Sequence, residues 1–173
     1  YDKIKYIFYL VIDTPLYICY NIISTTDKTV EVTWRTNGYD REDIVIPQFV
    51  NYNNTQYKVI RIGNSAFQGD DITSIKLPEG LLEIGESAFQ GCFITSRSIK
   101  LPEGLQSIGS NAFYGCDIPS VTIPESVRDL YNNSFASAKK IIFLGNTKPA
   151  NLTSHIADGR MCYVSSKANY GFG

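Results

Sequence analysis

The chain has 173 residues, of which 43% are hydrophobic and 19% charged, and its 16 Lys and Arg nearly balance its 17 Asp and Glu. This composition excludes an intrinsically disordered chain. The near-zero net charge argues against a surface that binds nucleic acid or anionic lipid. No apolar run reaches the roughly 20 residues that a membrane-spanning helix needs, so no membrane span is predicted.

Residues 1–56 are predicted to form an N-terminal β-rich cap. The apolar run Tyr6–Ile12 is short and ends at Asp13 without a small-residue cleavage site, so we interpret it as a strand and not as a signal peptide. The role of residues 1–15 is otherwise not indicated. Alternating patterns and turn residues predict an antiparallel meander whose last strand leads into the first repeat, with strands at Leu16–Ile23, Thr29–Arg35, Asp43–Val50 and Gln56–Ile62.

Two phrases alternate between residues 57 and 145. The first, Ile-Gly-x-x-Ala-Phe-x-Gly, begins at Ile62, Ile84 and Ile108, and a worn copy surrounds Phe135. The second is Leu-Pro-Glu-Gly-Leu at 77–81 and 101–105, with Ile-Pro-Glu-Ser-Val at 123–127. The Phe residues at 67, 89, 113 and 135 are 22, 24 and 22 residues apart. A period in the twenties is typical of a solenoid, in which each unit is one coil that buries its apolar side only by stacking on its neighbours.

Each coil is predicted to contain the same structural elements in the same order. A half-buried strand is followed by a type I turn with Pro at its second position, a short extended run ending at Gly85, and a helical or 3₁₀ turn that Gly91 closes in the left-handed conformation. Equivalent strands are expected to pair in parallel. The predicted core of the stack consists of Phe67, Phe89, Phe113, Phe135, Ile62, Ile84, Ile108, Leu77, Leu101 and Ile123.

The coil that contains Arg97 is two residues longer than its neighbours. The insertion is read as a bulge or a longer loop, or alternatively as a device that pushes Arg97 outward as a contact residue. After residue 145 the pattern fades, with Lys139 and Lys140 at positions expected to face inward. Residues 146–173 are therefore expected to form a closing segment that completes one continuous domain of about four coils, although the role of 146–160 is not indicated.

These phrases resemble the BspA-like leucine-rich repeat family. The resemblance is strong over 57–145 and weaker over 20–47. It implies a mainly β fold with short helical or 3₁₀ turns, arranged as a right-handed leucine-rich-repeat solenoid behind an antiparallel β cap. It also implies a secreted or surface-attached bacterial protein with a role in adhesion, and it transfers no catalytic residues. We expect that any signal peptide or anchor lies outside this chain.

Residues with catalytic or metal-binding chemistry are scarce. His155 is the only histidine, and no phosphate-binding phrase occurs, so neither an enzyme nor a cofactor is predicted. Three acidic residues at equivalent turn positions could line up as a ligand set for a divalent cation, but such residues are more often simply solvated, so no metal site is predicted. Cys92 and Cys116 could be bridged, but free inward-pointing thiols are the preferred reading. The three acidic residues are Glu79, Glu103 and Glu125.

A polar stripe is predicted along the outward positions of successive strands. Solenoids use such extended faces to bind partners, although the stripe could also be plain soluble surface. We hypothesise a binding or adhesion module for an extracellular protein or glycan. The alternative is a structural spacer, or a self-associating component of a cell-surface layer without a ligand of its own. The sequence indicates neither the ligand nor the oligomeric state. The candidate contact residues are Ser74, Lys76, Arg97, Ser98, Lys100, Ser120 and Thr122.

Overall fold

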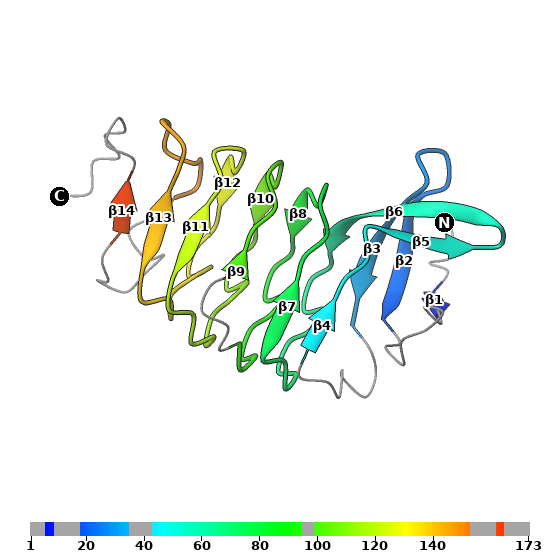
Figure 1. Cartoon of the computed structure of the whole chain (residues 1–173), viewed down its shortest axis with the longest axis horizontal. Helices are drawn as coiled ribbons and strands as arrows, with labels where there is room; N and C mark the ends of the chain where they lie inside the picture. Colours follow the sequence, from blue (N-terminus) through cyan, green and yellow to red (C-terminus); the bar gives the residue numbers. More distant parts are fainter. Residues whose placement is uncertain (1–5, 9–17, 35–42, 95–98, 153–161, 165–173) are drawn as a thin grey trace.

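The computed structural model describes residues 6–8, 18–34, 43–94, 99–152 and 162–164. Coils of similar shape are stacked along the long axis of the molecule, with the cap at one end and the strands β13 and β14 at the other (Figure 1). The regular secondary structure of the described residues consists of β-strands joined by turns. The expected mainly β repeat fold is therefore confirmed.

Strands on two sides of the coils form the sheets. On one side the strand order is β1-β2-β3-β6-β8-β10-β12, with β5 also paired to β6; on the other side the order is β9-β11-β13-β14, and β4 pairs with β7. In Figure 1 the strands β4, β7, β9, β11, β13 and β14 follow one another along the stack. The bounds are β1 Tyr6–Phe8, β2 Cys19–Ser24, β3 Thr29–Thr33, β4 Asp43–Val45, β5 Phe49–Tyr52, β6 Thr55–Ile62, β7 Ser74–Lys76, β8 Glu83–Ile84, β9 Ile99–Lys100, β10 Ser107–Ile108, β11 Val121–Ile123, β12 Asp129–Leu130, β13 Ile141–Phe143 and β14 Cys162–Val164.

Successive coils are bonded to each other on three sides. Ile62, Ile84 and Ile108 are aligned by the parallel pairing of β6, β8 and β10, and β9, β11 and β13 pair in parallel on the second side. The turns that carry the Phe residues form a third ladder. The Phe67 amide donates to the carbonyl oxygen of Ala88 at 2.8 Å, and the same bond recurs one coil later. Backbone amide and carbonyl groups on all three sides of a coil thus find partners in the neighbouring coils.

A column of phenylalanine rings fills the interior. The rings of Phe67, Phe89, Phe113 and Phe135 are fully buried. Adjacent centroids are 5.1, 5.0 and 4.9 Å apart, and the ring planes differ by 7°, 12° and 10°. The six aliphatic residues of the predicted core are also buried. The spacing of the Phe residues in the sequence therefore corresponds to direct ring-on-ring contact between coils.

The Ile-Gly step of the first phrase is required by close packing of the backbones. A Cβ on Gly85 would lie 2.8 Å from the carbonyl carbon of Gly63, and one on Gly109 would lie 2.7 Å from that of Gly85. In the next coil Tyr131 occupies this position. Its amide donates to the carbonyl oxygen of Ile108 at 3.1 Å, against 2.8 Å for the equivalent bond of Gly109. This one backbone bond is longer where the glycine is missing, while the phenylalanine rings of the same two coils stay 4.9 Å apart.

The segment predicted as a helical or 3₁₀ turn is a hydrogen-bonded turn. Ser87 accepts from the Gln90 amide and Phe89 accepts from the Cys92 amide, as in 3₁₀ geometry. Ser87 and Gly91, however, have φ angles of +54° and +76°. Two residues of the segment therefore adopt the left-handed backbone conformation, which a regular 3₁₀ helix does not contain. Gly91 takes the left-handed conformation that the sequence predicted.

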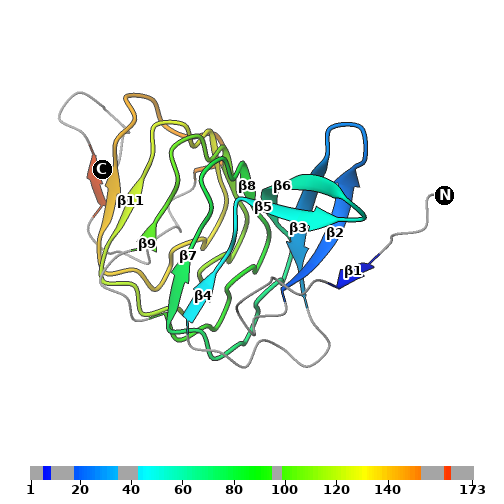
Figure 2. The ribbon, with the colours of Figure 1, turned by 45° about the vertical axis from the view of Figure 1, so that its right-hand side comes forward.

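The cap differs from the simple meander that the sequence predicted. Strand β2 pairs antiparallel with β1 and β3, as expected for a cap, but β3 then pairs in parallel with β6. The expected strand at 43–50 is split into β4 and β5. Pro47 lies at the break and has no amide hydrogen for a ladder. Strand β4 pairs with β7, so it belongs to the first coil and not to the cap, while β5 pairs with β6 (Figure 2).

The parallel pairing continues beyond residue 145. Strand β13 pairs with β14, and Ala150 forms a bridge to Asp129 of β12. The predicted insertion at 95–98 and the segment 153–161, which includes His155, lie outside the described residues.

Candidate binding face

The strands β7, β9 and β11, together with the turns that follow them, form what we call the inter-coil face. Each strand alternates, so that apolar side chains point into the stack and the residues between them point outward. Lys76, Lys100 and Thr122 are exposed at equivalent positions, and Lys100 and Thr122 are register partners. The alternation predicted from the sequence thus places these three side chains in one row.

The remaining candidate contact residues are less available. Ser74 and Ser120 are half-buried, and the Ser74 hydroxyl donates a hydrogen bond to the Asp43 carboxylate of the neighbouring strand β4. Arg97 and Ser98 lie outside the described residues.

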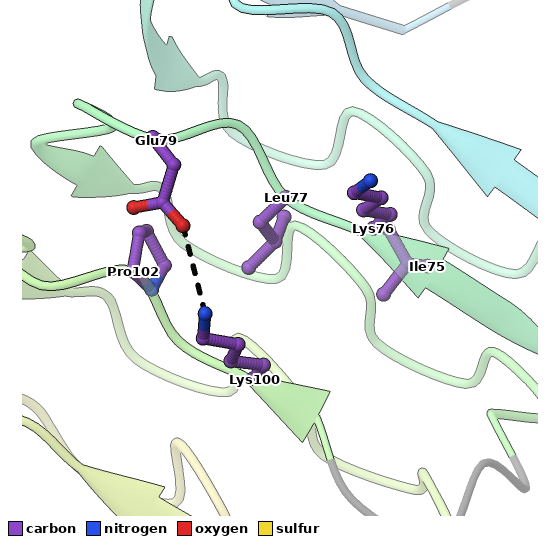
Figure 3. Close-up of a pocket in the computed structure, with 6 residues that line it drawn as sticks. All are labelled: Ile75, Lys76, Leu77, Glu79, Lys100 and Pro102. Atoms are coloured by element: carbon purple, nitrogen blue, oxygen red, sulfur yellow. Dashed lines mark ion pairs between the residues drawn. The ribbon is translucent and has the colours of Figure 1, made fainter.

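Two neighbouring hollows lie between coils on the inter-coil face. The first has a volume of about 170 Å³, and the second a volume of about 180 Å³. They share Lys100, and their other lining residues are largely equivalent positions shifted by one coil. Ile75, Lys76, Leu77, Glu79, Lys100 and Pro102 line the first hollow (Figure 3). Ile99, Lys100, Leu101, Glu103, Thr122, Pro124 and Leu144 line the second.

Each hollow combines an apolar floor with charged groups at its rim. In the first hollow, Leu77 and Pro102 are buried in the wall, while the charged ends remain in solvent. The Lys100 ammonium group lies 3.7 Å from the Glu79 carboxylate, and these side chains are 85% and 64% exposed. Such an exposed ion pair contributes little to stability and can be exchanged for an interaction with a ligand. Figure 3 shows this pair, with the Lys76 side chain lying apart from it.

The acidic residues at the turns act as rim groups of the hollows. Glu79 pairs with Lys100, and Glu103 lines the second hollow. In the described part of the chain, no three His, Cys, Asp or Glu side chains gather as metal ligands would. The sequence pattern predicted these acidic residues to be solvated and did not indicate the part that Pro102, Pro124 and Leu144 play in the hollows. The Leu-Pro-Glu phrase directly after each outward Lys was the available signal.

The cysteines of the phrases are buried free thiols. Cys92 and Cys116 form no disulfide, which confirms the preferred reading of the sequence. They lie inside the stack and are not part of the inter-coil face. No helix among the described residues is long and apolar enough to cross a membrane.

Comparison with known proteins gives a consistent picture. Residues 60–155 match, in six copies, the model of a BspA type leucine rich repeat region. A leucine-rich repeat protein from Bacteroides ovatus is 27% identical over 83% of this chain, with a TM-score of 0.50. One from Bacteroides capillosus is 25% identical over 86% of the chain, with a TM-score of 0.60. No curated protein matches the chain.

A third structure, described as a leucine rich cell surface protein from Faecalibacterium prausnitzii, is 23% identical over 86% of the chain, with a TM-score of 0.64. At this identity the likeness concerns the fold. The chain spans 48% of the Bacteroides ovatus protein, 42% of the Faecalibacterium prausnitzii protein and 94% of the Bacteroides capillosus protein.

Proposed function

Because the chain belongs to the BspA-type leucine-rich repeat family, we propose that it is a non-catalytic recognition module of a secreted or cell-surface protein. In this proposal it binds an extracellular protein or glycan through the inter-coil face and serves adhesion. The surface location is supported by the similar protein described as a leucine rich cell surface protein.

The observation that carries the proposal is the pair of equivalent hollows on one face. A hollow with an apolar floor and a charged rim offers both desolvation of an apolar group and hydrogen bonds that orient it. Because the hollows are adjacent and share Lys100, an elongated ligand can occupy both at once. Two weak contacts on one ligand combine into a much stronger one when the spacing matches.

The proposal is tested by surface plasmon resonance of the chain against immobilised matrix proteins and a glycan panel. We expect saturable binding to at least one partner, weakened about tenfold by Lys100→Ala, since this residue lines both hollows. Arg128→Ala is the matched control, because Arg128 is exposed and precedes β12 on the other sheet. Absence of any binder, or equal loss of binding in both variants, would contradict the proposal.

A further inference from the structure

We propose that the partner of the inter-coil face is a polypeptide segment that presents an acidic side chain to Lys76 and a basic side chain, three residues away, to Glu103. This inference rests on the proposed function and specifies its ligand. It follows from a pattern of ion pairs between neighbouring coils, which is incomplete at two positions.

The Glu79–Lys100 ion pair defines the pattern. Glu79 follows the outward residue Lys76 by three positions, and its carboxylate reaches the outward residue of the next coil, Lys100. A coil that repeated this arrangement would satisfy each outward lysine with a glutamate from the coil before it. Neither charge of such a pair would then be available to a ligand without competition.

On the N-terminal side of this pair the pattern lacks its carboxylate. Val45 is the register partner of Lys76, so the position equivalent to Glu79 in the preceding coil is occupied by Gln48. Gln48 is exposed and carries no charge. Among the described residues no carboxylate forms an ion pair with Lys76, which leaves an exposed cation at the edge of the first hollow.

On the C-terminal side the pattern lacks its cation. Glu103 follows Lys100 by three positions, as Glu79 follows Lys76. The register partner of Lys100 in the next coil is Thr122, which cannot form the ion pair. Glu103 is exposed and has no ion-pair partner in the described part of the chain, so the second hollow has an uncompensated carboxylate at its rim.

Charge and spacing together point to a polypeptide. Lys76 and Glu103 lie in adjacent coils, which are roughly 4.8 Å apart along the stack, and Glu103 is three residues, up to roughly 10 Å, further along its coil. The free cation and the free carboxylate are therefore on the order of 10 Å apart. A ligand with both an anionic and a cationic group is common among peptides and uncommon among glycans. In polyproline II conformation, residues three apart lie on the same side of the chain and about 9.3 Å apart. The two intervening residues would lie over the apolar floor formed by Leu77, Leu101 and Pro102.

The test begins with a random peptide library displayed on phage and selected on the folded chain. We expect enrichment of sequences with an acidic and a basic residue three positions apart. Synthetic peptides carrying only the acidic or only the basic residue should bind at least fivefold more weakly than the peptide with both. Binding of the complete peptide should weaken with added salt.

Two variants of the chain restore the interrupted pattern and leave Lys76, Lys100 and Glu103 in place. Gln48→Glu places a carboxylate in the coil before Lys76, at the position equivalent to Glu79, and Thr122→Lys places a cation in the coil after Glu103, at the register position of Lys100. With Gln48→Glu, the complete peptide should bind no better than the peptide that has only the basic residue. With Thr122→Lys, the complete peptide should bind no better than the peptide that has only the acidic residue. Gln106→Glu and Gln106→Lys are the controls, since Gln106 is exposed and precedes β10 on the other sheet; they should leave binding unchanged.

The possible outcomes separate the inference from the function on which it rests. If no charged motif is enriched, or if Gln48→Glu and Thr122→Lys bind the enriched peptide as tightly as the original chain, the inference is wrong. Binding of a glycan that depends on Lys100 but not on the charges added at positions 48 and 122 would overturn the inference and leave the proposed function intact. The proposed function itself would be contradicted if no ligand were found whose binding is weakened by Lys100→Ala.

Discussion

The thiol of Cys92 donates a hydrogen bond to the carbonyl oxygen of Phe67 in the preceding coil, over 2.9 Å. Cys116 makes the equivalent bond to Phe89 over 3.0 Å. Each cysteine thus forms a hydrogen bond to the coil before it, and both thiols are fully buried. The next coil has Ala138 at this position and cannot form the bond.

Burial of these thiols predicts a loss of stability at high pH. Desolvation raises the pKa of Cys116 from its ordinary value of 9.0 to about 12. Burial, followed by the nearby Cys116 and Asp70, raises the pKa of Cys92 even more. Since a thiol in the unfolded chain ionises near pH 9, the protonated thiols favour the folded state fully below that pH. This contribution is lost progressively above it, by up to about 1.4 kcal/mol per pH unit for each thiol.

The measurement is the free energy of unfolding in urea between pH 8 and pH 11, for the chain and for a Cys92→Ala, Cys116→Ala double variant. Lysine and tyrosine titration affects both proteins, so the difference between the two slopes isolates the thiols. We expect the original chain to lose stability more steeply. Equal slopes would show that the thiols ionise as easily in the folded state as in the unfolded chain.

Ser134 offers a second prediction. It occupies the position of Ala66, Ala88 and Ala112 in the other coils, is fully buried, and its hydroxyl has no hydrogen-bond partner among the described residues. Removing an unsatisfied buried hydroxyl restores the apolar contact, so Ser134→Ala should stabilise the chain by about 1 kcal/mol. Chemical denaturation measures this change.

Ser137 provides the control for this substitution. Its hydroxyl accepts a hydrogen bond from the Gly115 amide at 3.0 Å. In the earlier coils a backbone carbonyl oxygen accepts the equivalent bond from the glycine amide. Ser137→Ala should therefore destabilise the chain by roughly 0.5–1.5 kcal/mol. A destabilising effect of both substitutions would mean that the Ser134 hydroxyl does have a partner in solution.

The left-handed turn residues give a third prediction. Ser65, Ser87, Asn111 and Asn133 occupy the same position in four coils, with φ angles of +53°, +54°, +56° and +58°. Asparagine tolerates this conformation better than most residues that carry a Cβ. Ser87→Asn should therefore raise the free energy of unfolding by about 0.5 kcal/mol, and Ser87→Ala should lower it. A thermal melt in which both variants shifted the midpoint in the same direction would contradict this assignment.

The repeat itself could be predicted because its physical requirements recur. Each coil needs a ring to stack, a glycine where backbones touch and an outward polar residue on the strand, so Phe89, Gly85 and Lys100 are all visible as periodic identities. The cap does not repeat, and its pairing could not be derived in this way. Nothing in residues 43–50 except Pro47 indicates that half of the segment joins the first coil and half joins β6.

The binding face was predictable only in outline. Alternation along the strands placed Lys76 and Lys100 outward, but the hollows arise from contacts between coils. Pro102 reaches the first hollow from the coil after Leu77, and Leu144 reaches the second hollow from the end of β13. Assigning those neighbours requires the register between strands, which the sequence of one coil does not specify.

The central claim is that stacked phenylalanine rings hold successive coils together. It is tested most directly by the free energy of unfolding of Phe89→Ala, measured in denaturant beside Phe93→Ala, whose side chain is 65% exposed in the same coil. We predict a loss of about 3–5 kcal/mol for Phe89→Ala and of no more than about 0.5 kcal/mol for Phe93→Ala. Similar small losses for both variants would contradict the claim.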